Sequence, residues 1–293
     1  MFVNAIETVS LFTRPILFIS RYYGSTTVFP GSATLFFVNK DGWALTCRHV
    51  LESLLFTDPL SIKREKFRQE LNNTTLSIKD LESKYDYKDG AIFELKAYLQ
   101  NCIEGNLNLR YFYHSSLDLA LIKFDHFDRL LCDNFPVFAE HDDHLKQGKF
   151  LCRLGYPFPE FTNHIYNSTI DTIEWTDDVG SNYTPSFPIE GMVTRNLLKM
   201  DTNNKPYIYG FELSTPGLRG QSGGPAFDSD GRIWGMQSAT NHLDLDFDVN
   251  LEVNRNGVKK VVNESAFLHV GHCIHVSVIK EFMKSNNVQF NIG

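Results

Sequence analysis

Short runs of β-branched and aromatic residues, separated by turn residues, recur along most of the chain. In the N-terminal part these runs are 16–23, 26–29, 31–39 and 43–46. In the C-terminal half they are 149–154, 189–198, 207–214 and 233–240. Lys40-Asp41-Gly42 lies between two of the runs and is a hairpin turn signal. Strands and turns at this spacing predict an all-β fold, either a barrel or a sandwich.

Apolar residues at helical spacing interrupt this pattern in two charged segments, 61–73 and 77–85. Ser77, with Asp80 three residues later, resembles the capping box of a helix start. We therefore expect a helical insertion at about 57–110. Its charged face is expected to be solvated, and a role in binding a protein partner stays open.

Two further segments fit neither pattern. Residues 158–188 are rich in aromatic residues and prolines, and their length favours a surface loop over a site. Residues 241–268 separate two expected strands and include 244–250, where acids alternate with apolar residues. This stretch lacks the glycine and the distal glutamate of a calcium-binding loop, so a half-exposed strand is favoured. A last strand at 269–276 leads into a helix at 278–286.

Composition narrows the classes of function. The 293 residues are 42% hydrophobic and carry a net charge of −7, with no basic stripe of the kind that nucleic acids require. No apolar run is long enough to span a bilayer, and the first residues lack the order of a secretory signal. We expect a cytoplasmic protein with no nucleic-acid or membrane partner. The five cysteines are odd in number and irregularly spaced, which favours small buried residues over disulfides or a zinc site.

A glycine-dense stretch at 217–225 has the composition of a nucleophile loop, with Ser222 at its centre. A serine hydroxyl attacks a carbonyl only when a base takes its proton and N–H donors stabilise the resulting oxyanion. Gly220 can adopt backbone angles that turn its own N–H and that of Ser222 toward one point. An ordinary Gly/Ser turn between strands is the competing interpretation, and this stretch alone does not decide between them.

A histidine and an aspartate lie at the ends of predicted strands. His49 follows the run that ends at Thr46, and Asp118 precedes the nearly continuous apolar run 119–124. An isolated histidine is more often structural or solvated than catalytic. Yet an aspartate beside so much apolar surface is partly desolvated and needs a partner, and His49 is the obvious candidate.

Four motifs occur in order along the chain: Thr46-Cys47-Arg48-His49-Val50, 117–122, Gly155-Tyr156-Pro157 and 220–225. Together they resemble the trypsin-like, chymotrypsin-fold serine peptidases, whose base, acid and nucleophile follow the chain order His, Asp, Ser. The pattern is most similar to the catalytic domain of bacterial high-temperature-requirement-type peptidases. The resemblance covers about 31–283 outside the insertions. We expect no PDZ-like domain after the final helix, which would be a departure from that family.

This resemblance implies two packed antiparallel Greek-key β-barrels, with a helical insertion and a C-terminal helix. Residues 1–140 would form the first barrel and 141–293 the second, and the site would lie between them. His49 would act as base, Asp118 would orient it and Ser222 would attack the carbonyl. The N–H groups of Gly220 and Ser222 would hold the oxyanion, and no metal or organic cofactor is needed.

The resemblance also implies supporting residues. Ser238 would help to orient Asp118. Pro216 would lie at the base of the primary specificity pocket, with Thr240 and Gly271 on its walls. Because these groups offer no charge, we expect cleavage after small or medium apolar residues.

The sequence is consistent with two functions. The first is a serine endopeptidase acting on protein or peptide substrates. The second is a catalytically silent or assembly-activated fold of the same type that binds a protein partner. An intact His49, Asp118 and Ser222 favour the first.

Overall fold

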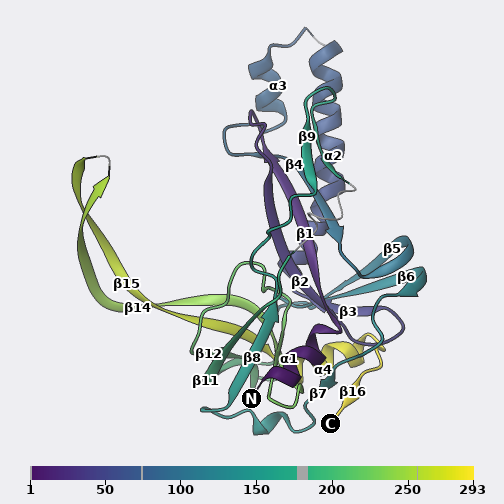
Figure 1. The fold of residues 1–293 in the computed structure, drawn as a ribbon, viewed down its shortest axis with the longest axis vertical. Helices are drawn as coiled ribbons and strands as arrows, with labels where there is room; N and C mark the ends of the chain where they lie inside the picture. Colours follow the sequence, from purple (N-terminus) through teal and green to yellow (C-terminus); the bar gives the residue numbers. More distant parts are fainter. Residues whose placement is uncertain (1, 74, 177–183, 256) are drawn as a thin grey trace.

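The computed structural model describes residues 2–73, 75–176, 184–255 and 257–293, and two curled sheets organise it (Figure 1). The first sheet is antiparallel throughout, in the order β4-β1-β2-β3-β6-β5. Its strands are β1 (Thr13–Tyr22), β2 (Phe29–Phe37), β3 (Trp43–Thr46), β4 (Ile92–Leu99), β5 (Ile103–Tyr113) and β6 (Ala120–Leu130). Within the described residues β4 and β5 do not pair, so this sheet curls without closing.

The second sheet closes on itself. Because β13 pairs with both β8 and β14, the strands β13-β8-β11-β12-β15-β14 form an antiparallel ring, to which β7 and β16 add in parallel. Its strands are β7 (Val137–Phe138), β8 (Phe150–Gly155), β11 (Phe187–Met200), β12 (Pro206–Leu213), β13 (Pro225–Phe227), β14 (Ile233–Arg255), β15 (Val258–His275) and β16 (Asn291–Ile292). The predicted all-β fold is confirmed, with the difference that only this sheet closes. A division into domains at residue 140 stays a prediction.

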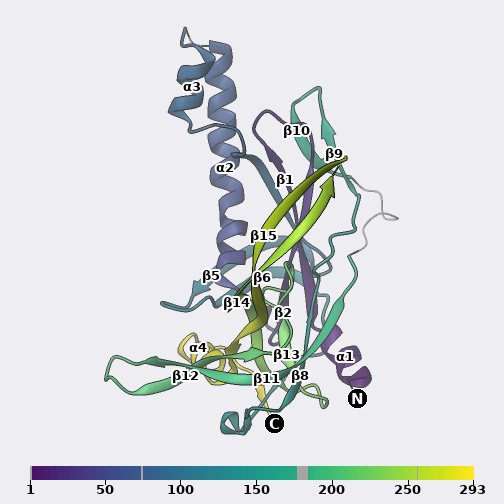
Figure 2. The same cartoon turned by 90° about the vertical axis from the view of Figure 1, so that its left-hand side faces the viewer.

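The helical insertion runs alongside β4 of the first sheet, and its far end projects beyond the strands (Figures 1 and 2). It contains α2 (Arg48–Asn73) and α3 (Ile78–Lys84), and the capping box of Ser77 and Asp80 is confirmed. The helical pattern at 61–73 is confirmed, but the helix is longer than that pattern, because α2 starts at Arg48 and runs through Pro59. The insertion is also shorter than expected, since β4 within 57–110 pairs with β1 and belongs to the sheet.

Buried contacts explain why α2 is so long. Leu51 and Leu54 pack on the main core near its start, and Phe67 near its end joins an aromatic cluster with Tyr87 and Phe93. Burial of apolar side chains at both ends stabilises the helix more than one proline in it costs.

The segment 158–188 contains a small hairpin of β9 (His164–Asn167) and β10 (Thr172–Trp175). Phe161 and Ile173 pack against Leu17 and Ile19 of β1. This part of the expected loop is therefore fastened to the first sheet. Residues 177–183 lie outside the described residues.

The segment 241–268 is not an interruption between strands, as the sequence suggested. Instead β14 and β15 both continue and pair along its length, forming a hairpin that extends away from the body (Figure 1). The expected half-exposed strand at 244–250 is part of this hairpin.

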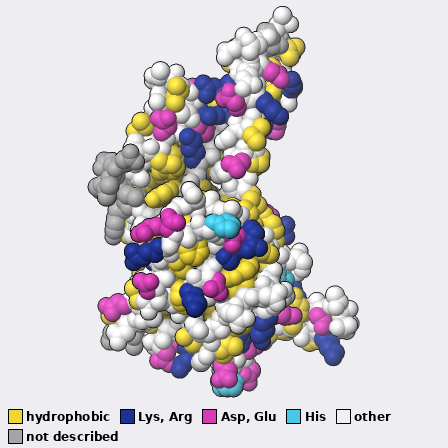
Figure 3. Space-filling view, turned by 90° about the vertical axis from the view of Figure 1, so that its right-hand side faces the viewer, with side chains coloured by type: hydrophobic (Ala, Val, Ile, Leu, Met, Phe, Trp, Pro, Cys, Tyr) yellow, Lys and Arg dark blue, Asp and Glu magenta, His cyan; other side chains and the backbone are white. Residues whose placement is uncertain are grey.

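The termini carry two helices, α1 (Val3–Ser10) and α4 (Val276–Ser285). No helix in the described part of the chain has the length and apolar character needed to cross a membrane. All five cysteines are free and buried, as predicted. Hydrophobic side chains gather across the middle of the face shown in Figure 3. Where the first sheet is open, the base of α2 and strands β4 and β5 line a hollow of about 510 Å³.

Candidate active site

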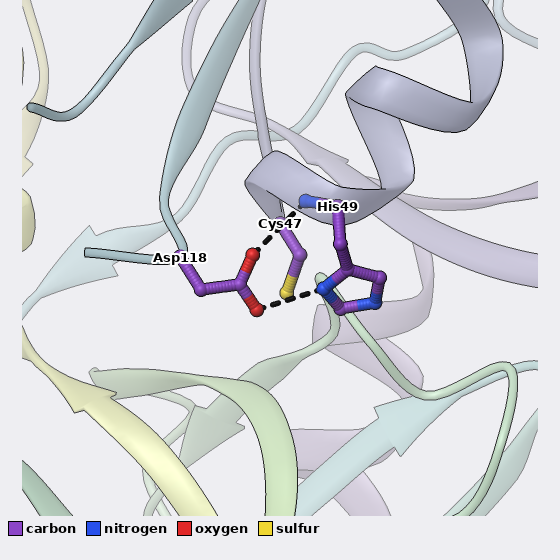
Figure 4. A group of neighbouring side chains, drawn as sticks. All are labelled: Cys47, His49 and Asp118. Atoms are coloured by element: carbon purple, nitrogen blue, oxygen red, sulfur yellow. Dashed lines mark hydrogen bonds and ion pairs between the residues drawn. The ribbon is translucent and has the colours of Figure 1, made fainter. Parts of the chain in front are cut away.

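The first sheet positions His49 and Asp118 beside each other. Thr46 at the end of β3 pairs with Ala120 at the start of β6, so the residues beyond these strand ends meet. His49 is the second residue of α2. Its Nδ1 lies 2.8 Å from Asp118 Oδ2, and its backbone N–H donates to Asp118 Oδ1 at 3.0 Å (Figure 4). The carboxylate therefore binds both the first turn of the helix and the ring.

The environment keeps Asp118 ionised. Its partial burial alone would raise its pKa. The hydrogen bonds from the ring and the backbone of His49, the charge of that ring and the hydroxyl of Ser238 outweigh burial and lower the pKa below its ordinary value of 3.8. The Ser238 hydroxyl donates to Asp118 Oδ2 at 2.9 Å. An ionised Asp118 favours the tautomer of His49 in which Nδ1 carries the proton and Nε2 is free to accept one.

The second sheet supplies the loop of Ser222, between β12 and β13. Gly220 and Gly223 have φ values of +95° and +89°, which disfavour other residues. A Cβ on Gly220 would overlap the carbonyl oxygen of Tyr156, and one on Gly223 would overlap that of Thr34. The glycines are therefore needed for close approach of the loop to its neighbours.

Thr34 of β2 ties this loop to the first sheet. Its N–H donates to the Ser222 carbonyl at 3.0 Å and its Oγ1 donates to the Gly220 carbonyl at 2.6 Å. The buried side chain of Gln221 holds the loop from the other side, accepting from the Leu218 N–H and donating to the Phe187 carbonyl, each at 3.1 Å. The loop backbone is thus fixed by both sheets.

The Ser222 hydroxyl donates to the Ser238 carbonyl at 3.4 Å, a long contact. Among the described residues it makes no hydrogen bond with His49. Within the described residues, the N–H groups of Gly220 and Ser222 donate no hydrogen bond. The structure thus brings Ser222 to Ser238, and Ser238 to Asp118 and His49, without joining the serine to the histidine.

The sequence model of the trypsin-like peptidase domain matches residues 31–236, more than half of the chain and a span that includes His49, Asp118 and Ser222. The chain belongs to the trypsin-like peptidase family.

Solved structures of proteases resemble this peptidase-family chain at low sequence identity. An HtrA-type protease, AlgW, with a decapeptide is 13% identical with a TM-score of 0.49, over 97% of this chain and 67% of that one. AlgW with a tripeptide is 13% identical with a TM-score of 0.48, over 97% of this chain. The Rv3671c protease from M. tuberculosis, in its active form, is 14% identical with a TM-score of 0.45, over 99% of this chain and 86% of that one. The chain spans 63% of the length of the tripeptide-bound AlgW chain. A comparison with curated protein sequences finds no match.

A hollow of about 430 Å³ lies beside Ser222, which is one of its lining residues. Of the pocket residues expected from the sequence, Pro216 and Thr240 line it. Gly271 is not among the lining residues. It lies instead against the guanidinium of Arg153, and a Cβ at this glycine would overlap Nη1 of that arginine.

Sequence reasoning missed Arg153 and Gln237. Both side chains are buried, and Arg153 Nη1 donates to Gln237 Oε1 at 2.7 Å. Arg153 lies on β8, two residues before the Gly155-Tyr156-Pro157 motif, but nothing local marks an arginine in a strand as buried. The glycines at 217 and 271 were the available signal, because they leave space for larger side chains beside the pocket.

Cys47 lies behind the pair of His49 and Asp118 (Figure 4). Ligand atoms of these three residues lie within 4.8 Å of one another, so among the described residues this group could hold a metal ion. Burial, followed by the charge of Asp118, raises the pKa of the Cys47 thiol well above its ordinary value. A protonated thiol is a poor metal ligand. The absence of a metal from the mechanism stays a prediction.

Proposed function

We propose that this chain is a serine endopeptidase that hydrolyses protein or peptide substrates through an acyl-enzyme. The observation that carries the proposal is the Asp118 carboxylate bonded at once to His49 Nδ1, the His49 N–H and the Ser238 hydroxyl. Three bonds to one carboxylate fix the ring with Nε2 available as a base. Family membership supports the same reaction class.

In the proposed reaction, His49 Nε2 takes the hydroxyl proton of Ser222 while Oγ bonds to the carbonyl carbon of the substrate. The carbonyl oxygen gains a negative charge, which the free N–H groups of Gly220 and Ser222 bind. The protonated Nε2 then gives its proton to the leaving amine as the C–N bond breaks. Water, deprotonated by the same nitrogen, attacks the acyl-enzyme, releases the acid and restores the Ser222 hydroxyl.

This sequence of steps requires one local movement. The Ser222 hydroxyl must turn from the Ser238 carbonyl toward His49. That movement is a rotation about χ1 between staggered positions, which a partly exposed side chain makes rapidly. The backbone of the loop does not have to move, because Thr34 and Gln221 already hold it.

A second candidate function is a silent or assembly-activated fold that binds a protein partner. The bond from Ser222 to the Ser238 carbonyl favours it, since this position of the hydroxyl is a resting one. The isolated chain would then fold and bind without hydrolysing peptides. Binding of a partner that turned the serine would switch the activity on.

Ser222→Ala distinguishes these functions. We expect kcat/KM on a fluorogenic peptide to fall about 10⁴- to 10⁶-fold, because the nucleophile is lost. The free energy of unfolding should change by less than about 0.5 kcal/mol, since no core cavity forms. Ser229→Ala, at an exposed turn of the same sheet, is the matched control and should keep full activity. Equal rates for the two variants would contradict the proposal.

A further inference from the structure

Arg153 is a fully buried cation without an anionic partner. It is 0% exposed, and its guanidinium donates to Gln237 Oε1, to the Thr215 carbonyl at 3.0 Å and to the Pro216 carbonyl at 3.1 Å. The Thr215 hydroxyl accepts a further bond at 2.5 Å. All of these acceptors are neutral, and no carboxylate in the described residues pairs with it. Burial lowers the pKa of Arg153, yet an arginine stays charged in proteins.

The arginine lies directly behind the pocket beside Ser222. Pro216, whose carbonyl accepts its bond, lines that pocket, and so does Gln237. Gly217 also lines it, and a Cβ there would overlap Gln237 Nε2. Gly217 and Gly271 therefore leave room for the linked side chains of Gln237 and Arg153, which back the pocket floor.

The remaining ionisable groups of the pocket are basic. Arg219, His242 and His269 line it, and the Nδ1 atoms of the two histidines lie 2.5 Å apart in a hydrogen bond. No aspartate or glutamate is among the described residues that line it. Glu212, on the neighbouring strand β12, is already paired with Arg195 and Asn241.

We propose that this pocket binds a carboxylate, the side chain of a glutamate or aspartate immediately before the cut bond. The inference rests on the proposed endopeptidase function and assigns its substrate class. A buried cation with only neutral acceptors stabilises an anion brought close to it, since the protein interior screens the attraction less than bulk water does. Gln237 Nε2 donates one hydrogen to the Ala239 carbonyl and has a second for a carboxylate oxygen, whereas the Thr240 hydroxyl donates to the Gly217 carbonyl and would have to turn from it.

This assignment replaces the expectation of apolar selectivity. That expectation counted only Pro216, Thr240 and Gly271, none of which is charged. The charge behind the pocket comes from Arg153 of β8, a residue that the expectation did not include. The same charge disfavours a lysine or arginine before the cut bond.

The test compares peptides that differ only in the residue before the cut bond: Glu, Gln, Ala, Val and Lys. We expect kcat/KM for Glu to exceed that for the isosteric Gln at least about tenfold, with Lys the poorest. Equal rates for Glu and Gln, or a preference for Ala or Val, would overturn the inference and leave the endopeptidase function standing. If no peptide is cut and a fluorophosphonate does not label Ser222, the endopeptidase function itself fails.

Two variants test the role of the charge. In Arg153→Met, the ratio of Glu to Gln rates should fall toward one while cleavage after Ala persists, which a merely structural role would not produce. If that variant does not fold, Arg219→Gln at the pocket rim should lower the same ratio about two- to fivefold. Arg232→Gln, in an exposed turn with Asp230, is the control and should leave the ratio unchanged. An unchanged ratio in Arg219→Gln together with a misfolded or unchanged Arg153→Met would contradict the proposal.

Discussion

The first sheet contributes a charge pair that is already bonded, whereas the second contributes a hydroxyl that is bonded elsewhere. Asp118 and His49 are held by two hydrogen bonds and a third from Ser238. Ser222 is held by its backbone, and its side chain points to the Ser238 carbonyl. Three hydrogen bonds hold the Asp118 carboxylate that fixes the ring tautomer, whereas the Ser222 side chain has to rotate only about χ1. His49 and Asp118 are therefore preorganised, whereas Ser222 needs a small side-chain movement.

The two sheets also differ in how they close. The ring of six strands in the second sheet packs a hydrophobic cluster that includes Leu151, Val193 and Phe211, and the buried Arg153 lies on one of its strands. The first sheet stays open between β4 and β5, with a hollow lined largely by apolar side chains. We therefore expect selectivity for the residue before the cut bond to depend on the closed sheet. The position of the proposed base, His49, is expected to depend on the open one.

The largest expected effect is on the charge pair. In Asp118→Asn, the amide has no negative charge, so it accepts the bonds from the ring and the backbone N–H of His49 less strongly. Its own N–H group favours the tautomer of His49 in which Nδ1 carries no proton. We expect kcat to fall about 10³- to 10⁴-fold with little change in KM. Asp230→Asn, which changes an exposed acid paired with Arg232, should be neutral. A loss in Asp118→Asn smaller than about tenfold would show that the pair does not act as inferred.

As the pH falls, we expect the second sheet to lose stability before Asp118 is protonated. Burial, with a smaller contribution from Lys280, lowers the pKa of His275 from 6.5 to about 4, although Asp142 opposes the shift. Between these values the unfolded chain binds a proton that the folded chain does not, so stability falls as the pH drops from 6.5 to 4. The loss amounts to about 3 kcal/mol at most. Asp118 keeps its charge over this range, because its pKa is lowered.

His275→Asn tests this origin of acid sensitivity. His275 Nδ1 accepts from the Ser277 N–H and caps α4, and asparagine can replace that bond. We expect the urea midpoint of the variant to change less between pH 6.5 and 4.5 than that of the unaltered chain. His141→Asn, at an exposed site, is the control. The same acid shift in His275→Asn as in the unaltered chain would assign the sensitivity to another group.

A smaller effect is expected at the joint between the sheets. Thr34→Val keeps the shape of a buried side chain but removes the donor to the Gly220 carbonyl. Loss of that bond should destabilise the protein by about 1–3 kcal/mol and lower kcat about tenfold by loosening the Ser222 loop. Thr194→Val removes a bond to the Glu212 carbonyl within the second sheet alone and should affect stability only. Unchanged kcat in Thr34→Val would indicate that the loop does not depend on the first sheet.

The features that could be predicted from the sequence are those determined by residues close together along the chain. Strand alternation, the capping box at Ser77 and the glycines around Ser222 depend on neighbours along the chain, and each led to a prediction of the correct element. The full length of α2 was not predicted, because packing of residues distant in sequence, among them Phe67 with Tyr87, stabilises the helix. The paired extension of β14 and β15 was missed because strand partners are not encoded by spacing alone.

The candidate site divides in the same way. Motif order singled out His49, Asp118 and Ser222, and of these the structure joins His49 to Asp118. The direction of the Ser222 hydroxyl and the burial of Arg153 follow from three-dimensional packing and have no sequence signature. Gly217 and Gly271 look like ordinary turn and strand glycines until the side chains that occupy their space are known.

Labelling by a fluorophosphonate tests the central claim most directly, since the reagent bonds only to a serine whose hydroxyl is activated by a base. The account predicts that mass spectrometry of the labelled full-length chain finds the adduct on Ser222. The adduct should be lost in His49→Ala and retained in Ser229→Ala. A folded chain that carries no adduct on Ser222, or one whose labelling is unaffected by His49→Ala, would contradict the account.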